Sequence, residues 1–429
     1  MKEYSFRITE AQLYNLGSLM AAKATGKVLV CECGGGQAVF SDECERMSWS
    51  FKAVLSDADA ASIGNYDFKS NLKYCIVSSD MHELRKAAFP NERILWCYLI
   101  NGEIQAYSFC TDLQLVDVSL VIGHALHYSF GSREVHMLDG QKYERTAQAF
   151  GAGTVEFLSN LTVGIVGASG TGSIVAEQLY RLGVKRLVLV DDDYVEERNL
   201  GRILNSTVED ALNHINKTEM LKLAYDRIGM GTEIIAVPTV VAAPDAIRKL
   251  SQCDVVFGCL DSADGRMYTN RLCTFYTIPY IDMGVKLKSD DGNISEISGA
   301  VRYIVPGEAS LHSIGAYTNE QVESEALRRD DPVAYRERLK EKYIEGAQEG
   351  SPAVICVNMQ IASLAVLELL NRFHEYRDTP NSDVEVLNIN LLEPAFPQPE
   401  APGKPDMGLR KYLGKGDCKP FLDMPSIGV

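Results

Sequence analysis

Three glycines and a later aspartate are the residues whose types and spacing point most directly to chemistry. Gly167, Gly170 and Gly172 lie in the run GASGTG, directly after an apolar run that ends at Val166. Glycines in this arrangement let the backbone approach a phosphate, and the N-terminus of the following helix faces the anion. Asp191 follows about twenty residues later, where a carboxylate binds a ribose hydroxyl. The pattern predicts a nucleotide site.

A strand–loop–helix–strand unit must position these residues. The β-branched run 163–166 predicts a buried parallel strand, and 186–190 predicts a second one. Apolar residues at helical spacing predict a helix between them that ends at Gly183. Ser169 occupies the middle position of the usual G-x-G, so the loop alone fits a dinucleotide as well as ATP.

Two basic residues beyond the second strand distinguish an ATP site from a dinucleotide site. Arg202 and Lys217 follow the acidic run that begins at Asp191. A dehydrogenase has no use for an arginine and a lysine there, whereas an enzyme that must neutralise the phosphates of ATP does. We therefore expect ATP.

The same segment resembles the ThiF/MoeB/HesA family, the bacterial relatives of ubiquitin-activating enzymes. The family pattern is D-x-D-x-V-x-x-x-N-L-x-R followed by a lysine, and residues 191–202 and Lys217 match it. The resemblance implies a doubly wound, Rossmann-like α/β domain. It also implies an ATP site made by Gly167, Ser169, Gly170, Gly172, Asp191, Asp193, Asn199, Arg202 and Lys217.

A further aspartate follows a later predicted strand. Residues 254–258 read as a strand, and Asp261 follows it in a sequence that resembles the family motif C-T-D-N. The resemblance implies that Asp261 holds Mg²⁺, and a carboxylate at the carboxyl end of a central strand points into the ligand crevice. The alternative is that Asp261 caps the helix that begins near Ala263.

An arginine upstream of the glycine loop resembles another family signature. Tyr143-Glu-Arg145, followed by Phe150-Gly151, is similar to Y-x-R-Q…G. The resemblance implies that Arg145 enters the ATP site of a partner subunit, so we expect a homodimer. The alternative is a surface arginine on a short helix.

The rest of the chain predicts two domains. Residues 1–140 read as a smaller α/β domain with a helix at 8–21 and Thr9 as a possible cap, and they resemble a degenerate JAB/MPN domain. Residues 141–429 form the predicted ThiF-type adenylation domain, with a crossover segment at about 285–350. Relatives carry zinc-binding cysteines after the equivalent of Pro306, and these are absent here, so no zinc is expected.

Composition excludes several classes of protein. The net charge of −16 makes nucleic acid an unsuitable partner. Without a signal peptide or a long apolar run, we expect neither secretion nor a membrane span. Eleven scattered cysteines, without a C-x-x-C pair, indicate a reduced cytoplasm.

The resemblance implies adenylation of the C-terminal carboxylate of a ubiquitin-like or sulfur-carrier protein, with ATP and Mg²⁺. If a thioester follows, Cys418 between Lys415 and Lys419 has the most suitable electrostatics, whereas Cys259, Cys273 and Cys356 are expected to be buried in apolar runs. A conjugating enzyme would then be a partner, as in bacterial ubiquitin-like (Bil-type) conjugation operons used in antiviral defence.

Three alternatives stay open at this point. The protein could adenylate a short peptide, as microcin-maturation enzymes do. It could be a nicotinamide-dependent oxidoreductase, although this gives Arg202, Lys217 and Asp261 no role. It could also be a non-catalytic subunit, against which the same three residues argue together.

Overall fold

The computed structural model describes residues 3–23, 27–35, 46–70, 72–109, 111–131, 140–290, 293–340, 354–393 and 397–427. The chain divides into two compact units. The first contains residues 1–134 together with 274–278 and 409–429, and the second contains 135–273 and 279–408. Two segments from the range predicted for the adenylation domain therefore cluster with the first unit. In the described part of the chain, no helix is long and apolar enough to cross a membrane.

The second unit is built on an eight-stranded sheet of order β12-β11-β10-β13-β14-β15-β16-β17. The first five strands in this order pair in parallel, and the pairs beyond β14 are antiparallel. The strands are β10 (Thr162–Val166), β11 (Arg186–Val190), β12 (Glu233–Val237), β13 (Val255–Gly258), β14 (Tyr280–Asp290), β15 (Asn293–Ile304), β16 (Val386–Asn390) and β17 (Gln398–Glu400).

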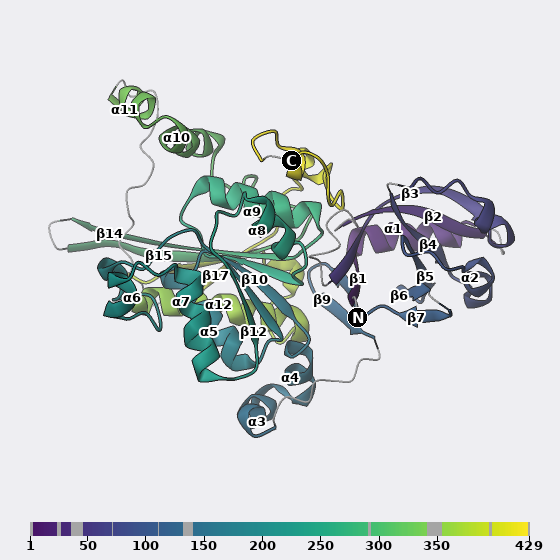
Figure 1. Ribbon diagram of the computed structural model, residues 1–429, viewed down its shortest axis with the longest axis horizontal. Coiled ribbons are helices and arrows are strands. Elements are labelled where there is room, and N and C mark those ends of the chain that lie inside the picture. The colour runs from purple at the N-terminus through teal and green to yellow at the C-terminus, as the bar shows by residue number, and fades with distance from the viewer. Residues whose placement is uncertain are drawn as a thin grey trace. The chain divides into compact units, whose positions relative to one another are not determined.

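Helices cover both faces of this sheet, with α5, α7 and α12 on one face and α8 and α9 on the other (Figure 1). Strands β10 and β11 are consequently buried at every residue, as strands covered on both faces must be. This arrangement confirms the predicted doubly wound α/β fold. The helices are α3 (Gly140–Phe150), α4 (Ala152–Leu158), α5 (Gly170–Leu182), α6 (Val208–Leu212), α7 (Lys217–Ile228), α8 (Pro244–Leu250), α9 (Ala263–Phe275), α10 (Asn319–Asp330), α11 (Pro332–Lys340), α12 (Ile355–His374) and α13 (Met407–Arg410).

The strand order reverses at the junction of β10 and β13. From β10 the chain moves outward to β11 and β12, then returns to add β13 on the other side of β10. Ligands of doubly wound proteins bind outside the carboxyl ends of the strands at such a switch point. The glycine loop follows β10 and Asp261 follows β13, so both lie at this edge.

The predicted crossover segment begins as a long hairpin. Strands β14 and β15 pair from Tyr280 opposite Ile304 to Asp290 opposite Asn293. Helices α10 and α11 follow, and residues 341–353, where the prediction placed the end of the crossover, lie outside the described residues.

The first unit contains a nine-stranded mixed sheet of order β7-β6-β5-β4-β2-β3-β1-β8-β9. Its strands are β1 (Glu3–Thr9), β2 (Lys27–Gly34), β3 (Arg46–Asp59), β4 (Lys73–Ser78), β5 (Ile94–Ile100), β6 (Glu103–Phe109), β7 (Leu113–Leu115), β8 (Val118–Ile122) and β9 (Leu126–Phe130). Its helices are α1 (Glu10–Ala21) and α2 (Met81–Ala87).

The helix expected at 8–21 starts two residues later than predicted. Thr9 caps it, with a reciprocal capping box to Gln12. Ile8 instead lies in β1, because it faces the core between parallel strands β3 and β8.

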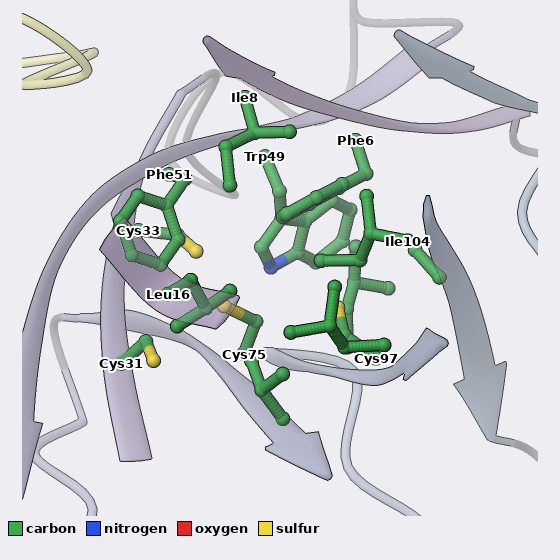
Figure 2. Close-up of a cluster of buried hydrophobic side chains, with 14 of the residues drawn as sticks. Phe6, Ile8, Leu16, Cys31, Cys33, Trp49, Phe51, Cys75, Cys97 and Ile104 are labelled. Carbon is green, nitrogen blue, oxygen red and sulfur yellow. The ribbon is translucent and has the colours of Figure 1, made fainter. Parts of the chain in front are cut away.

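One face of the first sheet carries a core that contains cysteines (Figure 2). Cys31 and Cys33 share this face, as their alternation predicts, and Cys75 and Cys97 join them from β4 and β5. Burial raises the pKa of Cys33 and of Cys75, so these thiols stay protonated and behave as small apolar side chains.

The C-terminal tail is part of the first unit. The amide of Gly414 donates to the carbonyl of Thr274 at 3.2 Å, and that of Gly416 donates to Phe275 at 2.8 Å. The hydroxyl of Tyr276 donates to Asp417 at 2.6 Å. The tail is therefore hydrogen-bonded in place beside residues 274–278.

Candidate nucleotide site

The glycine loop needs glycine at two positions for different reasons. Gly167 has a φ of +91°, and a Cβ there would lie 2.6 Å from the carbonyl oxygen of Cys259. A Cβ on Gly172 would overlap the carbonyl oxygen of Gly167. The loop therefore packs tightly against itself and against the residue after β13. A side chain at Gly167 or Gly172 would not fit there.

The N-terminus of α5 has no side-chain cap. Ser169 is its N-cap residue, but its hydroxyl accepts no hydrogen bond from the first turn. The first amides of a helix otherwise lack partners, and they carry the positive end of its dipole. The start of this helix is therefore suited to bind an anion.

Asp191 directly follows β11 and lies beside the glycine loop. Its carboxylate accepts from the amide of Ala168 at 2.6 Å and from the amide of Asp193 at 2.9 Å. Burial raises the pKa of Asp191, and the nearby Lys217 ammonium opposes this shift. The carboxylate fixes the loop, and each of its oxygens retains capacity for a further donor such as a ribose hydroxyl.

Lys217 lies on the same side and is already paired. Its side chain is buried, with Nζ 2.6 Å from Asp193 and 3.8 Å from Asp191. Asn216 caps α7 through the amide of Thr218, and its Nδ2 donates to the carbonyl oxygens of Asp191 and Asp193. This group (Asp191, Asp193 and Lys217) is called the paired side below.

Arg202 is different, because its guanidinium makes no ion pair or hydrogen bond within the described residues. It is half-buried, and its aliphatic stem lies 3.3 Å from the position of a Cβ on Gly170. Asn199, predicted to bind the nucleotide, is buried and accepts from the amide of Glu196 at 3.1 Å, which shapes the turn before Arg202.

Asp261 is exposed at the carboxyl end of β13, and its carboxylate makes no hydrogen bond or ion pair within the part of the chain that the structure describes. The cap of α9 comes from its neighbour, because Ser262 Oγ accepts from the amide of Gly265 at 3.3 Å. The helix-cap role that the sequence left open for Asp261 therefore belongs to Ser262. Free carboxylate oxygens at the switch point are the ligands that Mg²⁺ prefers, so Asp261 fits the predicted metal. We call Arg202 and Asp261 the open side.

Near Asp261, two guanidinium groups share one carboxylate. Asp282 is fully buried, 3.2 Å from Arg266 Nε and 2.9 Å from Arg302 Nη1. Burial works against the charge on Arg266, but Asp282, Tyr280 and Asp261 outweigh it and raise its pKa. Asp261 is thus a second carboxylate near Arg266, so the formal charges of the two guanidinium groups and the two carboxylates balance here. The sequence did not single out Arg302, and no pattern around it indicates this role.

Arg145 lies at the opposite edge of the sheet from the glycine loop. It is exposed on α3, where it donates to Gln148 at 3.0 Å. Tyr143, two residues earlier, is buried and donates to the carbonyl of Met230, which precedes the amino end of β12. Arg145 therefore does not reach the nucleotide loop of its own chain.

The thiols agree with their prediction only in part: Cys273 is buried as expected, whereas Cys259 is half-buried. Cys356 was expected to be buried, but it is exposed, because it lies in the first turn of α12 on the side away from the sheet. Cys418 is half-buried in the first unit, and its Sγ donates to the carbonyl of Pro420 at 3.2 Å. Burial raises the pKa of Cys418, with Lys415 opposing the shift, and a raised pKa disfavours the nucleophilic thiolate.

One group of carboxylates has the spacing of a metal site. Asp191, Asp192 and Asp193 place oxygens within 4.8 Å of one another, and no other such group occurs among the described residues. Lys217 already neutralises part of this charge through Asp191 and Asp193, so we assign no ion to the three carboxylates.

Comparison with known proteins shows which family the chain belongs to. The ThiF family model matches residues 143–409, more than half of the chain. The ubiquitin-like modifier-activating enzyme 5 of Caenorhabditis elegans is 30% identical over 191 residues, which are 41% of this chain and 42% of that protein. The enzyme of the same name from Branchiostoma floridae is 27% identical over 186 residues, 41% of this chain and 44% of that protein. The chain thus spans less than half the length of these two relatives.

Solved structures of E. coli MccB are also similar. The complex with ATP has a TM-score of 0.45 and 19% identity, over 63% of this chain and 74% of that one. The complex with succinimide has a TM-score of 0.47 and 18% identity, over 63% and 75%. The family match extends across the whole of the candidate site, from α3 to the start of the tail. The chain therefore belongs to the ThiF family.

Proposed function

We propose that the protein adenylates a carboxylate with ATP. The carboxylate oxygen bonds to the α-phosphorus of ATP, the bond from that phosphorus to the bridging oxygen breaks, and pyrophosphate leaves. The observation that carries this proposal is the unpaired guanidinium of Arg202 beside the uncapped N-terminus of α5. A polyphosphate supplies the negative charge that both features lack, whereas a nicotinamide cofactor leaves Asp261 without a ligand.

The residues of the site would divide the work between binding and charge neutralisation. The glycine loop and α5 would hold the phosphate chain, and Asp191 would accept from the ribose. Mg²⁺, held by Asp261, would reduce the negative charge of the phosphates. Arg202 and Lys217 would add positive charge, because an anionic nucleophile and an anionic phosphate repel each other until they are neutralised and aligned.

The carboxylate substrate is proposed to be the C-terminal glycine of a ubiquitin-like or sulfur-carrier protein. The guanidinium groups of Arg266 and Arg302 beside β14 would attract an anionic carboxylate that arrives there. Exchange of labelled pyrophosphate into ATP tests this, with ubiquitin-like proteins and short peptides compared as substrates. Exchange that depends on a ubiquitin-like protein supports the proposal, exchange with peptides alone assigns the peptide alternative, and no exchange with either contradicts adenylation.

A homodimer would explain Arg145, which lies away from its own glycine loop. In a two-fold pair, each Arg145 would enter the site of the other subunit. Mixing inactive Arg145→Ala with inactive Asp261→Ala should restore about a quarter of wild-type exchange, because half of randomly mixed dimers carry one intact site of two. No recovery despite demonstrated subunit exchange would contradict a role in trans.

Transfer to a thiol is a separate proposal, with Cys418 as the predicted acceptor and a conjugating enzyme as the next partner. Trapping of labelled substrate under non-reducing conditions tests it in Cys418→Ser and in Cys356→Ser, which removes the exposed thiol of the second unit. Label lost only in Cys418→Ser supports the prediction. Loss of label only in Cys356→Ser would assign the thioester to Cys356 instead.

A further inference from the structure

Asn358 is a buried amide that the roles described above do not use. It lies in the first two turns of α12 and is 2% exposed. Its backbone amide donates to Val354 as in a regular helix, and its side chain makes no hydrogen bond to any described residue. A buried polar group without a partner is costly and uncommon in native structures. The Asn358 amide is therefore a candidate for binding a ligand.

The Asn358 side chain is directed at the start of α5. A Cβ built on Gly170, the first residue of that helix, would overlap Asn358 Nδ2 and would lie 3.3 Å from Arg202 Cδ. The amide nitrogen and the aliphatic stem of Arg202 therefore meet at the uncapped helix end. The Asn358 amide and the guanidinium that this stem carries are hydrogen-bond donors without a partner among the described residues, so the helix end is suited to an anion.

The helix that carries Asn358 is fixed against the sheet and against α5. Gln178 of α5 donates to Ser363 of α12 at 3.0 Å. On the other face of α12, Ile361 occupies the space that a Cβ on Gly299 of β15 would need. These contacts hold the amide in place before any ligand arrives, which lowers the ordering cost of binding.

We propose that Asn358 binds the phosphate chain of the nucleotide, donating from Nδ2 beside Arg202. This rests on the proposed function, because it assigns a further binding residue to the same site. Helix α12 then contributes a specific donor to the nucleotide site in addition to covering the sheet. Gly170 is required for a corresponding reason, since any side chain there would displace this donor.

Calorimetric titration with ATP·Mg, and competition with adenosine, tests the proposal on the full chain. Asn358→Ala removes the donor, and Asn358→Asp keeps the shape of the side chain but replaces the donor with a carboxylate. Loss of one hydrogen bond to a charged group corresponds to roughly tenfold weaker ATP binding for Asn358→Ala. Asn358→Asp should bind still more weakly, because its charge repels the phosphates. Adenosine affinity should stay unchanged in both variants.

Ser363→Ala is the matched control, because it alters the packing of α12 on α5 without touching the amide. It should bind ATP as the wild type does, and thermal unfolding should show that all three variants are folded. Wild-type ATP affinity in both Asn358 variants overturns the inference alone. Equal losses for ATP and adenosine, or an equal loss in Ser363→Ala, also overturn it, because they indicate packing. No ATP binding by the wild type overturns the proposed function together with this inference.

Discussion

The two sides of the glycine loop differ in how their charges are satisfied. On the paired side, Lys217 is buried and already forms ion pairs with Asp193 and Asp191. On the open side, Arg202 and Asp261 make no side-chain hydrogen bond or ion pair within the described residues. The paired side thus stabilises the fold whether or not a ligand is bound, whereas the open side depends on charges that a ligand supplies. Substitutions on the two sides should therefore separate stability from activity.

The largest effect is expected at Asp261. Asp261→Ala should lower pyrophosphate exchange at least about 100-fold, because loss of a metal clamp removes several kcal/mol of transition-state stabilisation. The matched variant is Ser262→Ala, which removes the actual helix cap and should lower the free energy of unfolding by about 1 kcal/mol while exchange continues. If Asp261→Ala keeps near-normal exchange with an unchanged magnesium requirement, the open side does not include Asp261.

The next test compares the two cations. Arg202→Ala should reduce exchange by about 10-fold to 100-fold and change the free energy of unfolding by less than about 0.5 kcal/mol, because no ion pair or side-chain hydrogen bond is lost. Lys217→Met should reduce exchange similarly and also cost about 2 kcal/mol of stability, because it leaves a buried carboxylate less compensated. Urea unfolding measures the difference between the variants. If Arg202→Ala and Lys217→Met have equal free energies of unfolding, the paired side does not stabilise the fold more than the open side.

A smaller effect concerns the proton on Asp191. Its pKa is raised by burial and opposed by Lys217, so Lys217→Met should raise it further. A raised carboxyl pKa means that the folded state holds the proton more tightly, so the contribution of this group to stability is present at low pH and is lost as pH rises through the folded pKa. Carbon-13 NMR titration of the carboxyl group measures the pKa in both proteins. A lower pKa in Lys217→Met would contradict the pairing described here.

Local patterns in the sequence predicted the second unit well. The strand at Arg186–Val190 and the helix end at Gly183 follow from apolar runs and glycine, which act within a few residues. The role of Ser262 could not be separated from that of Asp261, since either can precede a helix and only the hydrogen-bond geometry decides. The exposure of Cys356 was missed because the apolar residues around it alternate between the core and the surface of α12.

Asn358 and Arg302 were missed as site residues for a related reason. Each comes from an element far along the chain from the glycine loop, and its importance arises only when α12 or β15 packs beside residues from other elements. The spacing of residues within one segment does not show which distant segments pack against it.

Calorimetric binding of ATP·Mg and of NADH to the wild type and to Arg202→Ala tests the central claim most directly. The account predicts that the wild type binds ATP·Mg and not NADH, and that Arg202→Ala binds ATP·Mg at least about tenfold more weakly. Tight NADH binding by the wild type, with no binding of ATP·Mg, would contradict it.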